Sequence, residues 1–242
     1  MVNAFLFLLI AFIYSTAGFG GGSMYLALLS QFGLTASMVR FTGLACNAVV
    51  TAQGSFNFSR AGWISWRQLL PILFCSVPTC VLAASLHVEE KTYFIVLGFC
   101  LLLAGVGMIF RKKETTDDIN AKNPLWLYPV GALIGFVSGL TGIGGGVYLS
   151  PLLYLTGWGS SKKIAAASSV FILVNSLAGI ITHVLVHGIE PHEDMIMLLV
   201  AVLIGGFAGS RMGSSVLSQN TVKYLTIFII IFASLRILAK NL

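Results

Sequence analysis

The chain carries the same glycine-rich motif twice, as GFGGGSMY at residues 18–25 and as GIGGGVYL at residues 142–149. Both copies lie in unusually long apolar stretches, at residues 2–32 and 125–157. Glycine is the poorest helix-forming residue after proline, whereas lipid demands a helix with every backbone group hydrogen-bonded. Each motif therefore predicts a broken membrane helix that leaves backbone N–H groups without partners.

The composition indicates a polytopic, all-α membrane protein. Hydrophobic residues make up 57% of the 242 residues and charged residues 9%, with a mean hydropathy of +0.93, far from a water-soluble domain. The first residues lack a basic segment, so we expect them to be structural and not a cleaved signal. The net charge of +6 fits loops beside lipid headgroups and does not indicate nucleic acid. The four cysteines occur in apolar segments without a CxxC pair, which predicts small buried residues, neither disulfides nor ligands: Cys46, Cys75, Cys80 and Cys100.

The chain divides into two related halves. We predict a first membrane repeat at 1–110, a charged linker at 111–123 and a second membrane repeat at 124–242. Each repeat begins with a glycine-broken segment, and three ordinary spans follow it, near 38–58, 66–87 and 91–110 and near 163–186, 194–216 and 221–239. All six have the length of a bilayer-crossing helix. Asn47 and Asn175 occupy matching spans, as expected of an internal duplication.

Duplicated halves with interrupted hydrophobic segments favour a secondary transporter whose site lies at the interruptions. The alternative is that glycine only allows close helix packing. We expect that simpler role for the isolated glycines Gly98, Gly105 and Gly135.

Two arrangements of the broken segments are open. If each segment crosses the membrane once, eight of the 14 Lys and Arg residues fall on one side. If each enters, turns at the glycines and leaves on the same side, ten fall on one side, which the positive-inside rule prefers. This re-entrant arrangement inverts the second half relative to the first and leaves both termini outside. A tilted, broken single crossing would also place the glycines deep in the membrane.

An unwound GxGGG segment is suited to an anion. The helix that restarts at Ser23 or Val147 directs its positive end and its free N–H groups at the break. Glycine also permits the positive φ that anion-binding turns use. We therefore expect an anion site between the two turns near the bilayer midplane, with Asn47 and Asn175 orienting the ligand; an interhelical hydrogen bond is the simpler role for either amide. The predicted substrate-binding residues are Gly20, Gly21, Gly22, Ser23, Asn47, Gly144, Gly145, Gly146 and Asn175.

The paired glycine motifs, "AASSVFILVNSLAG" around Asn175 and "RAGWISWRQLLP" at 60–71 resemble the sulfite exporter TauE/SafE family, also called the sulfonate uptake permease family. The likeness covers nearly the whole chain, and the second glycine motif is the closer match. The resemblance implies transport of sulfur-containing anions across a prokaryotic inner membrane. It fixes neither the substrate nor the direction.

Other polar residues in the spans are candidates for the pathway or for coupling: Arg40, Gln53, Thr141, Ser168, Ser169 and His183. A cluster of acids and histidines before residue 195 lacks an HxxxH or HExxH spacing, so we predict a solvated turn and no metal or other cofactor. All eight acids lie in linkers or at span ends, which leaves no carboxylate at mid-membrane to relay protons or hold sodium.

The resulting hypothesis is a secondary transporter that works by alternating access, with export favoured by the membrane potential. The expected partners are a small anion and membrane lipid. The sequence does not reveal the oligomeric state, which leaves a homo-oligomer as one alternative. The alternative is an anion channel or uniporter. A purely structural membrane subunit would need neither glycine turn. An intramembrane enzyme would need a nucleophile and a base, and Ser23 with His183 has no supporting motif, so we expect no enzymatic activity.

Overall fold

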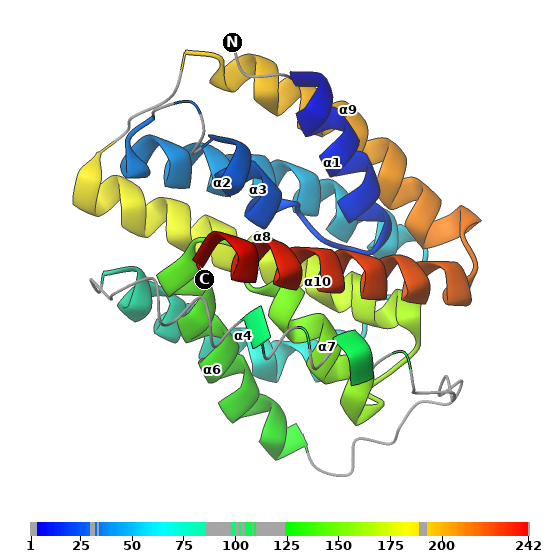
Figure 1. Cartoon of the computed structure of the whole chain (residues 1–242). Coiled ribbons are helices and arrows are strands. Elements are labelled where there is room, and N and C mark those ends of the chain that lie inside the picture. The colour runs from blue at the N-terminus through cyan, green and yellow to red at the C-terminus, as the bar shows by residue number, and fades with distance from the viewer. Residues whose placement is uncertain are drawn as a thin grey trace.

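The computed structural model describes residues 4–29, 32, 34–85, 98–99, 102, 105–107, 109, 124–188 and 193–241. Within these residues the protein is all-helical and contains no strand (Figure 1). The elements of the first half are α1 (Ala4–Thr16), α2 (Gly22–Leu29), α3 (Ala36–Arg60) and α4 (Trp66–Ala84). Those of the second half are η2 (Pro124–Trp126), α6 (Leu127–Thr141), α7 (Gly146–Thr156), α8 (Ser161–His187), α9 (Met195–Arg211), the π-helical η3 (Met212–Val216) and α10 (Gln219–Asn241).

Both long apolar stretches break at the glycine motifs, as predicted. The first break separates α1 from α2 and contains Gly18 and Gly21, with φ of 78° and 89°. The second separates α6 from α7 and contains Gly142, Gly144 and Gly145, with φ of 66°, 83° and 75°. Side chains other than glycine rarely adopt such angles, so the motif itself ends one helix and redirects the next.

The ordinary spans are largely as predicted. Among the residues that the structure describes, three helical segments are both long and apolar enough to cross a membrane: Trp66–Ala84, Ser161–Val186 and Met195–Val216. Helices α3 and α10 have the length, at 25 and 23 residues, but are less apolar. The predicted span at 91–110 lies mostly outside the described residues, and its described positions are helical.

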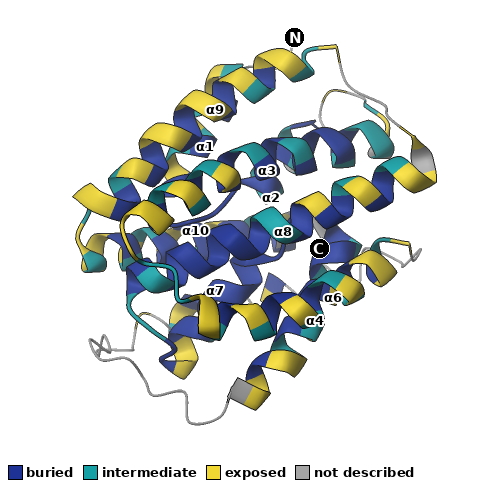
Figure 2. Cartoon of the chain, turned by 180° about the vertical axis from the view of Figure 1, so that it is seen from behind, coloured by how far each residue is buried: buried dark blue, intermediate teal, exposed yellow. Residues whose placement is uncertain are grey.

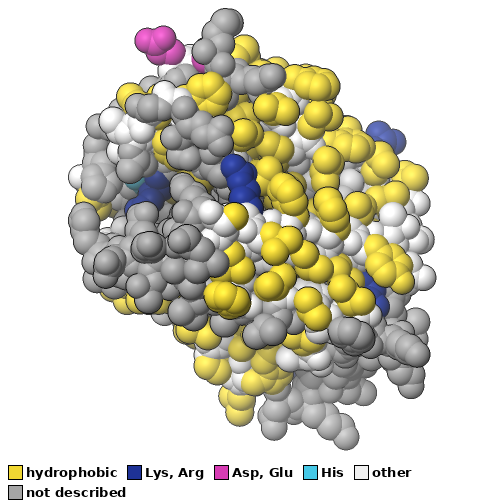
Figure 3. Space-filling model, viewed as in Figure 1, with side chains coloured by type: hydrophobic (Ala, Val, Ile, Leu, Met, Phe, Trp, Pro, Cys, Tyr) yellow, Lys and Arg dark blue, Asp and Glu magenta, His cyan; other side chains and the backbone are white. Residues whose placement is uncertain are grey.

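Helix α8 is the centre of the molecule. In its apolar 18-residue stretch 72% of the residues are buried, against 33% and 39% in those of the other two apolar spans, and Figure 2 shows α8 dark along much of its length. The outward surface is apolar and suited to lipid, since side chains such as Phe74, Leu185 and Ile196 are about four-fifths exposed, at 78%, 81% and 77%. Hydrophobic side chains also cover much of the described surface in Figure 3.

Glycine stripes join the two halves by close backbone contact. A Cβ added to any of three glycines of α6 would collide with a carbonyl oxygen of α4: Gly131 with Ile72, Gly135 with Ser76 and Gly139 with Cys80. A second stripe, on α9 and η3, meets α1 in the same way: Gly205 with Leu8, Gly209 with Phe12 and Gly213 with Thr16. In both pairs the helices run parallel, and the broken helix of one half packs on the second ordinary span of the other. Gly135 therefore has the packing role that was predicted for it.

Helices α3 and α8 run antiparallel along each other. Ser37 of α3 contacts His183 of α8. Further along, Gly179 meets Leu44, and Gly54 meets Ser169. The α3 numbers rise as the α8 numbers fall, so the two helices point in opposite directions.

Helix α2 folds back along α1. The rings of Phe7 and Tyr25 stack with their centroids 4.8 Å apart, although Phe7 lies nine residues before the end of α1 at Thr16. A helix that continued straight would separate the two rings by well over 10 Å at 1.5 Å per residue. The first glycine turn therefore reverses the chain.

The cysteines are free thiols where the structure describes them. Cys46 and Cys80 are buried, as predicted, whereas Cys75 is only half-buried, which corrects the prediction for that residue. Cys100 lies outside the described residues.

We expect Gly135→Ala to destabilise the contact between α4 and α6. The new methyl group has no room against the backbone of Ser76, and overpacking of this kind costs about 1–3 kcal/mol. The melting temperature in detergent should fall by about 2–4 °C per kcal/mol. Gly159→Ala is the control, since its nearest neighbour would be Lys163 Cβ at 3.4 Å. Equal melting of the two variants would contradict the role given to this stripe.

Candidate anion site at the glycine turns

Asn47 of α3 joins the two glycine turns. Its Nδ2 donates a hydrogen bond of 2.8 Å to the carbonyl of Ile143 in the second turn. A Cβ added to Gly144 would lie 3.0 Å from the same Nδ2, and one added to Gly20 or Gly22 of the first turn would collide with the amide. The side chain is fully buried, at 0% exposure. The structure therefore brings the two motifs together, although the amide itself fills the space between them.

Both turns carry backbone donors without acceptors. Within the described part of the chain, no hydrogen bond is made by the N–H groups of Gly20, Gly21, Gly22, Ser23, Gly144, Gly145, Gly146 and Val147. All of these residues except the half-buried Ser23 are buried. Buried N–H groups without a partner are rare and costly, so such a cluster indicates a place for a ligand that accepts hydrogen bonds.

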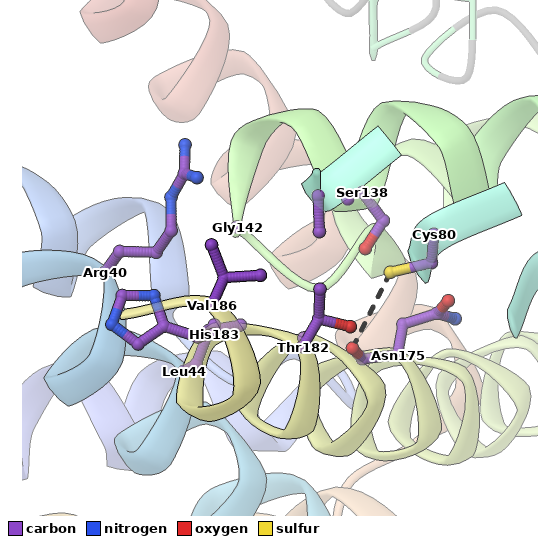
Figure 4. Close-up of a pocket in the computed structure, with 12 residues that line it drawn as sticks. Arg40, Leu44, Cys80, Ser138, Gly142, Asn175, Thr182, His183 and Val186 are labelled. Carbon is purple, nitrogen blue, oxygen red and sulfur yellow. Dashed lines mark hydrogen bonds between the residues drawn. The ribbon is translucent and has the colours of Figure 1, made fainter. Parts of the chain in front are cut away.

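A cavity of about 20 Å³ borders the second turn. It is enclosed by α3, α4, α6 and α8, with these lining residues: Arg40, Leu44, Cys80, Ala84, Ser138, Gly139, Gly142, Asn175, Gly179, Thr182, His183 and Val186. Figure 4 shows Arg40 and His183 toward one end and Ser138, Cys80 and Asn175 toward the other. Val186 is 59% exposed and Ser138 only 2%, so the Arg40 end is the mouth. The volume suits a single water-sized occupant.

Arg40 places a cation at the mouth of the cavity. Its Nη2 donates to the carbonyl of Leu140 at 3.3 Å, at the end of α6. The stem of the side chain passes Gly142, where an added Cβ would lie 3.2 Å from Arg40 Cγ. Among the described residues Arg40 has no carboxylate partner, because the only described acids are Glu193 and Asp194, just before α9. The guanidinium is thus positioned to attract an anion toward the second turn.

His183 lines the same cavity. The ring is 5% exposed. Its Nε2 lies 3.2 Å from Ser37 Oγ, and the ring of Phe41 is 5.7 Å away. Both contacts come from α3, so His183 also helps to hold α8 against α3. The pairing of His183 with Ser23 that an enzyme would need is not among its described contacts.

The other candidates from the sequence take part in internal contacts. Asn175 Nδ2 donates to Phe171 O at 2.9 Å and to Ser76 Oγ at 3.2 Å. Ser168 bonds Ser150 at 2.6 Å, and Ser169 donates to Gly18 O at 3.0 Å.

Two further candidates differ in position. Thr141 donates to Val137 O at 2.9 Å and accepts from the N–H of Ile143 at 3.3 Å, so it shapes the second turn. Gln53 lies against Gly206 of α9, away from the cavity.

Sequence reasoning missed Ser138, Ser176, Thr182 and Cys80. Thr182 and Cys80 line the cavity without any motif around them. Ser138 stands four residues before Gly142, and that spacing on a helix is the signal that could have identified it. Ser176 directly follows Asn175 and is fully buried, at 0% exposure.

Long apolar helices around a buried polar cavity with a cation at its mouth are typical of a polytopic membrane transporter. The chain belongs to the sulfite exporter TauE/SafE family, whose family model matches residues 3–237. This confirms the resemblance seen in the motifs. No solved structure matches the chain.

Curated relatives agree with the family. The chain is 33% identical to the "Probable membrane transporter protein y4hK" of Sinorhizobium fredii over 97% of this chain and 96% of the relative. It is 23% identical to the "Probable membrane transporter protein YjnA" of Bacillus subtilis over 96% of each chain. A "Probable membrane transporter protein" of Haemophilus influenzae is 25% identical over 82% of this chain and 79% of the relative. The protein is therefore a membrane transporter of this family.

We expect Asn47→Leu to weaken the junction between the turns. The substitution leaves the buried carbonyl of Ile143 without its donor, which costs about 1–3 kcal/mol. Thr51→Val is the control, since that buried hydroxyl bonds only its own helix, at Asn47 O, 2.7 Å away. Thermal unfolding in detergent should show the larger loss for Asn47→Leu, and an equal loss would mean that the bond does not hold the turns together.

Proposed function

We propose that this protein is a secondary transporter that moves small sulfur-containing anions, such as sulfite or an organosulfonate, across a prokaryotic inner membrane, with export favoured. The observation that carries the proposal is the pair of buried glycine turns that meet at Asn47 with unbonded N–H groups. An oxyanion is the ligand that such donors suit. The family's description supports the sulfur chemistry, and the bacterial sources of the relatives support the location.

The charges near the site also favour an anion. Arg40 supplies a cation at the cavity mouth, and the described residues lining the cavity include no acid. A cation substrate would find no counter-charge there. With the cell interior negative, export of a monoanion gains about 2.3 kcal/mol per 100 mV.

Helix directions support the re-entrant, inverted arrangement of the halves. If both broken segments crossed the membrane once, α3 and α8 would run parallel, yet their contacts run antiparallel from Ser37–His183 to Gly54–Ser169. The chain reversal at the first glycine turn also supports the re-entrant arrangement. Arg60 ends α3 and Lys162 lies near the start of α8, and the positive-inside rule places this end of both helices at the inner side of the membrane. The cavity lies toward the other end, at Arg40 and His183, so in this arrangement it opens outward.

A closed inner face favours a carrier over a channel. There Lys162 of α8 is 8% exposed, and its ammonium donates to Ser214 O at 3.3 Å. The ammonium also lies 5.4 Å from the centre of the Trp63 ring, whose indole N–H donates to the same carbonyl at 2.9 Å. This Lys162–Trp63–Ser214 contact joins the two halves beside a small core formed by Phe58, Ala165, Ala166 and Val222. A channel needs a continuous path, whereas alternating access needs one closed face at a time.

The proposal is tested by sulfite flux into or out of proteoliposomes, with taurine, thiosulfate, sulfate and chloride as competitors. We expect saturable, selectively inhibited flux for wild type and a loss of at least tenfold for Gly145→Ala. At that position φ is 75°, and a Cβ would press on Phe171 and Ser138. Gly62→Ala is the matched control, because φ is 76° and nothing lies within 4 Å. Absence of flux for all these anions, or an equal loss in both variants, would contradict the proposal.

Alternating access predicts that weakening the Lys162–Trp63–Ser214 contact exposes the inner face. The reporter is Ala166→Cys, buried at 0% exposure, in a chain without other cysteines. Lys162→Gln should raise its rate of labelling by an impermeant thiol reagent about fivefold, the effect of roughly 1 kcal/mol for one cation–π contact. Lys163→Gln should leave the rate unchanged. A rate that Lys162→Gln does not alter would show that this contact is no gate.

A further inference from the structure

Two buried hydroxyls beside the second glycine turn have no acceptor among the described residues: Ser138 Oγ of α6 and Ser176 Oγ of α8. They are 2% and 0% exposed. Neighbouring hydroxyls on the same helices behave differently, because Thr141 donates to Val137 O and Thr182 to Ala178 O, each at 2.9 Å. Serine and threonine often satisfy themselves on their own helix in this way. In the described part of the chain, Ser23, Thr42 and Ser55 are further buried hydroxyls without a partner, but Ser138 and Ser176 lie as a pair beside one turn, which makes this place a candidate for a ligand.

Both hydroxyls face the turn whose N–H groups are unbonded. A Cβ added to Gly145 would lie 3.1 Å from Ser138 Oγ. One added to Gly144 would lie 3.0 Å from Ser176 Oγ and 3.0 Å from Asn47 Nδ2. Ser138 and Ser176 therefore flank the second turn from opposite helices, and Asn47 reaches it from a third.

Ser138 also points into the inner end of the cavity, toward Cys80 and Asn175 (Figure 4). The Cys80 thiol there is only a weak acceptor, and its own proton is directed to Asn175 O at 3.8 Å. A ligand that enters past Arg40 thus reaches a hydroxyl donor whose contact in the protein is the weak Cys80 acceptor. The amide oxygen of Asn175, which also lines the cavity, has no donor among the described residues.

The first turn is built differently. Its Gly18 carbonyl accepts a hydrogen bond from Ser169 Oγ at 3.0 Å. By the spacing of the two repeats, Ser138 corresponds to Tyr14 and Ser176 to Ala48. The first turn therefore lacks these two serines, and the buried serine hydroxyl without a partner there among the described residues is Ser23 Oγ, on the helix that follows the turn. Gly142 of the second turn lines the cavity, whereas no residue of the first turn does, and Ser176 itself lies outside the lining, next to the lining residue Asn175.

We propose that the two turns have different tasks, with Ser138 and Ser176 donating hydrogen bonds to the transported anion at the second turn and the first turn acting as a structural brace. This inference rests on the proposed function and locates its binding site. The ligand is a compact inorganic oxyanion that only accepts hydrogen bonds, because the hydroxyls of Ser138 and Ser176 and the N–H groups of the second turn are donors. The cavity of about 20 Å³ has room for one water molecule, so it must widen for any anion, and least for a compact one.

The test is equilibrium binding to the purified protein by isothermal titration, with sulfite, sulfate, methanesulfonate and taurine as probes. Ser138→Ala and Ser176→Ala should each raise the Kd for sulfite about tenfold, since a hydrogen bond to a charged group is lost. Melting temperatures should stay near wild type, because Ser176 lacks a partner among the described residues and Ser138 has only a weak contact with the Cys80 thiol. Methanesulfonate and taurine should bind more weakly than sulfite.

Two controls separate binding from folding. Ser234→Ala removes a buried hydroxyl that bonds its own helix, at Ile231 O, 2.7 Å away, and should leave the Kd unchanged. Ser169→Ala should lower the melting temperature and leave the Kd within about twofold.

The outcomes are distinguishable. If wild type binds sulfite and neither Ser138→Ala nor Ser176→Ala changes the Kd, the division of tasks is wrong while the proposed function stands. A Kd raised as much by Ser169→Ala as by Ser138→Ala would also overturn it. If wild type binds none of the probes, both the inference and the proposed function fail.

Discussion

The hydrogen bond from Asn47 Nδ2 to Ile143 O is the contact on which the centre of the molecule depends. It is made by an amide that is wholly buried, in a protein whose surroundings offer no water to replace it. Through this bond one helix of the first half holds the unwound backbone of the second half, and the same amide fills the space beside Gly20 and Gly22. Two breaks that would each be unstable alone thus support one another.

Close helix contact stabilises this arrangement. Lipid supplies no hydrophobic drive between helices, so stability must come from dispersion and backbone proximity. Parallel glycine stripes on α6 and α9 provide that proximity, each against a helix of the other half. The glycine turns can then remain unwound because rigidly packed helices hold their ends. Glycine consequently has two separate uses in this chain, positive φ at the turns and a missing Cβ on the helix faces.

The helical breaks, most of the spans and the meeting of the two motifs could be predicted from sequence, because glycine spacing and apolar runs are local signals. Side-chain roles were harder to predict. In sequence, Asn175, Ser168 and Ser169 resemble residues that bind ligands, yet the Asn175 Nδ2 and both hydroxyls hydrogen-bond another segment of the protein. Ser176 lies within the motif around Asn175 and Ser138 four residues before Gly142, but neither pattern distinguishes a hydroxyl that binds its own helix from one left without an acceptor. Such competition for acceptors is a property of three-dimensional packing.

Helix α8 carries features of both faces of the protein along one uninterrupted rod. Lys162 lies near its first residue and contacts Trp63 and Ser214, whereas Asn175 and His183 line the cavity toward its other end. The antiparallel α3 lies along it. Under the proposed alternating access, a rigid tilt of this one helix would open one face only while it closes the other, because the contacts of both faces belong to the same element.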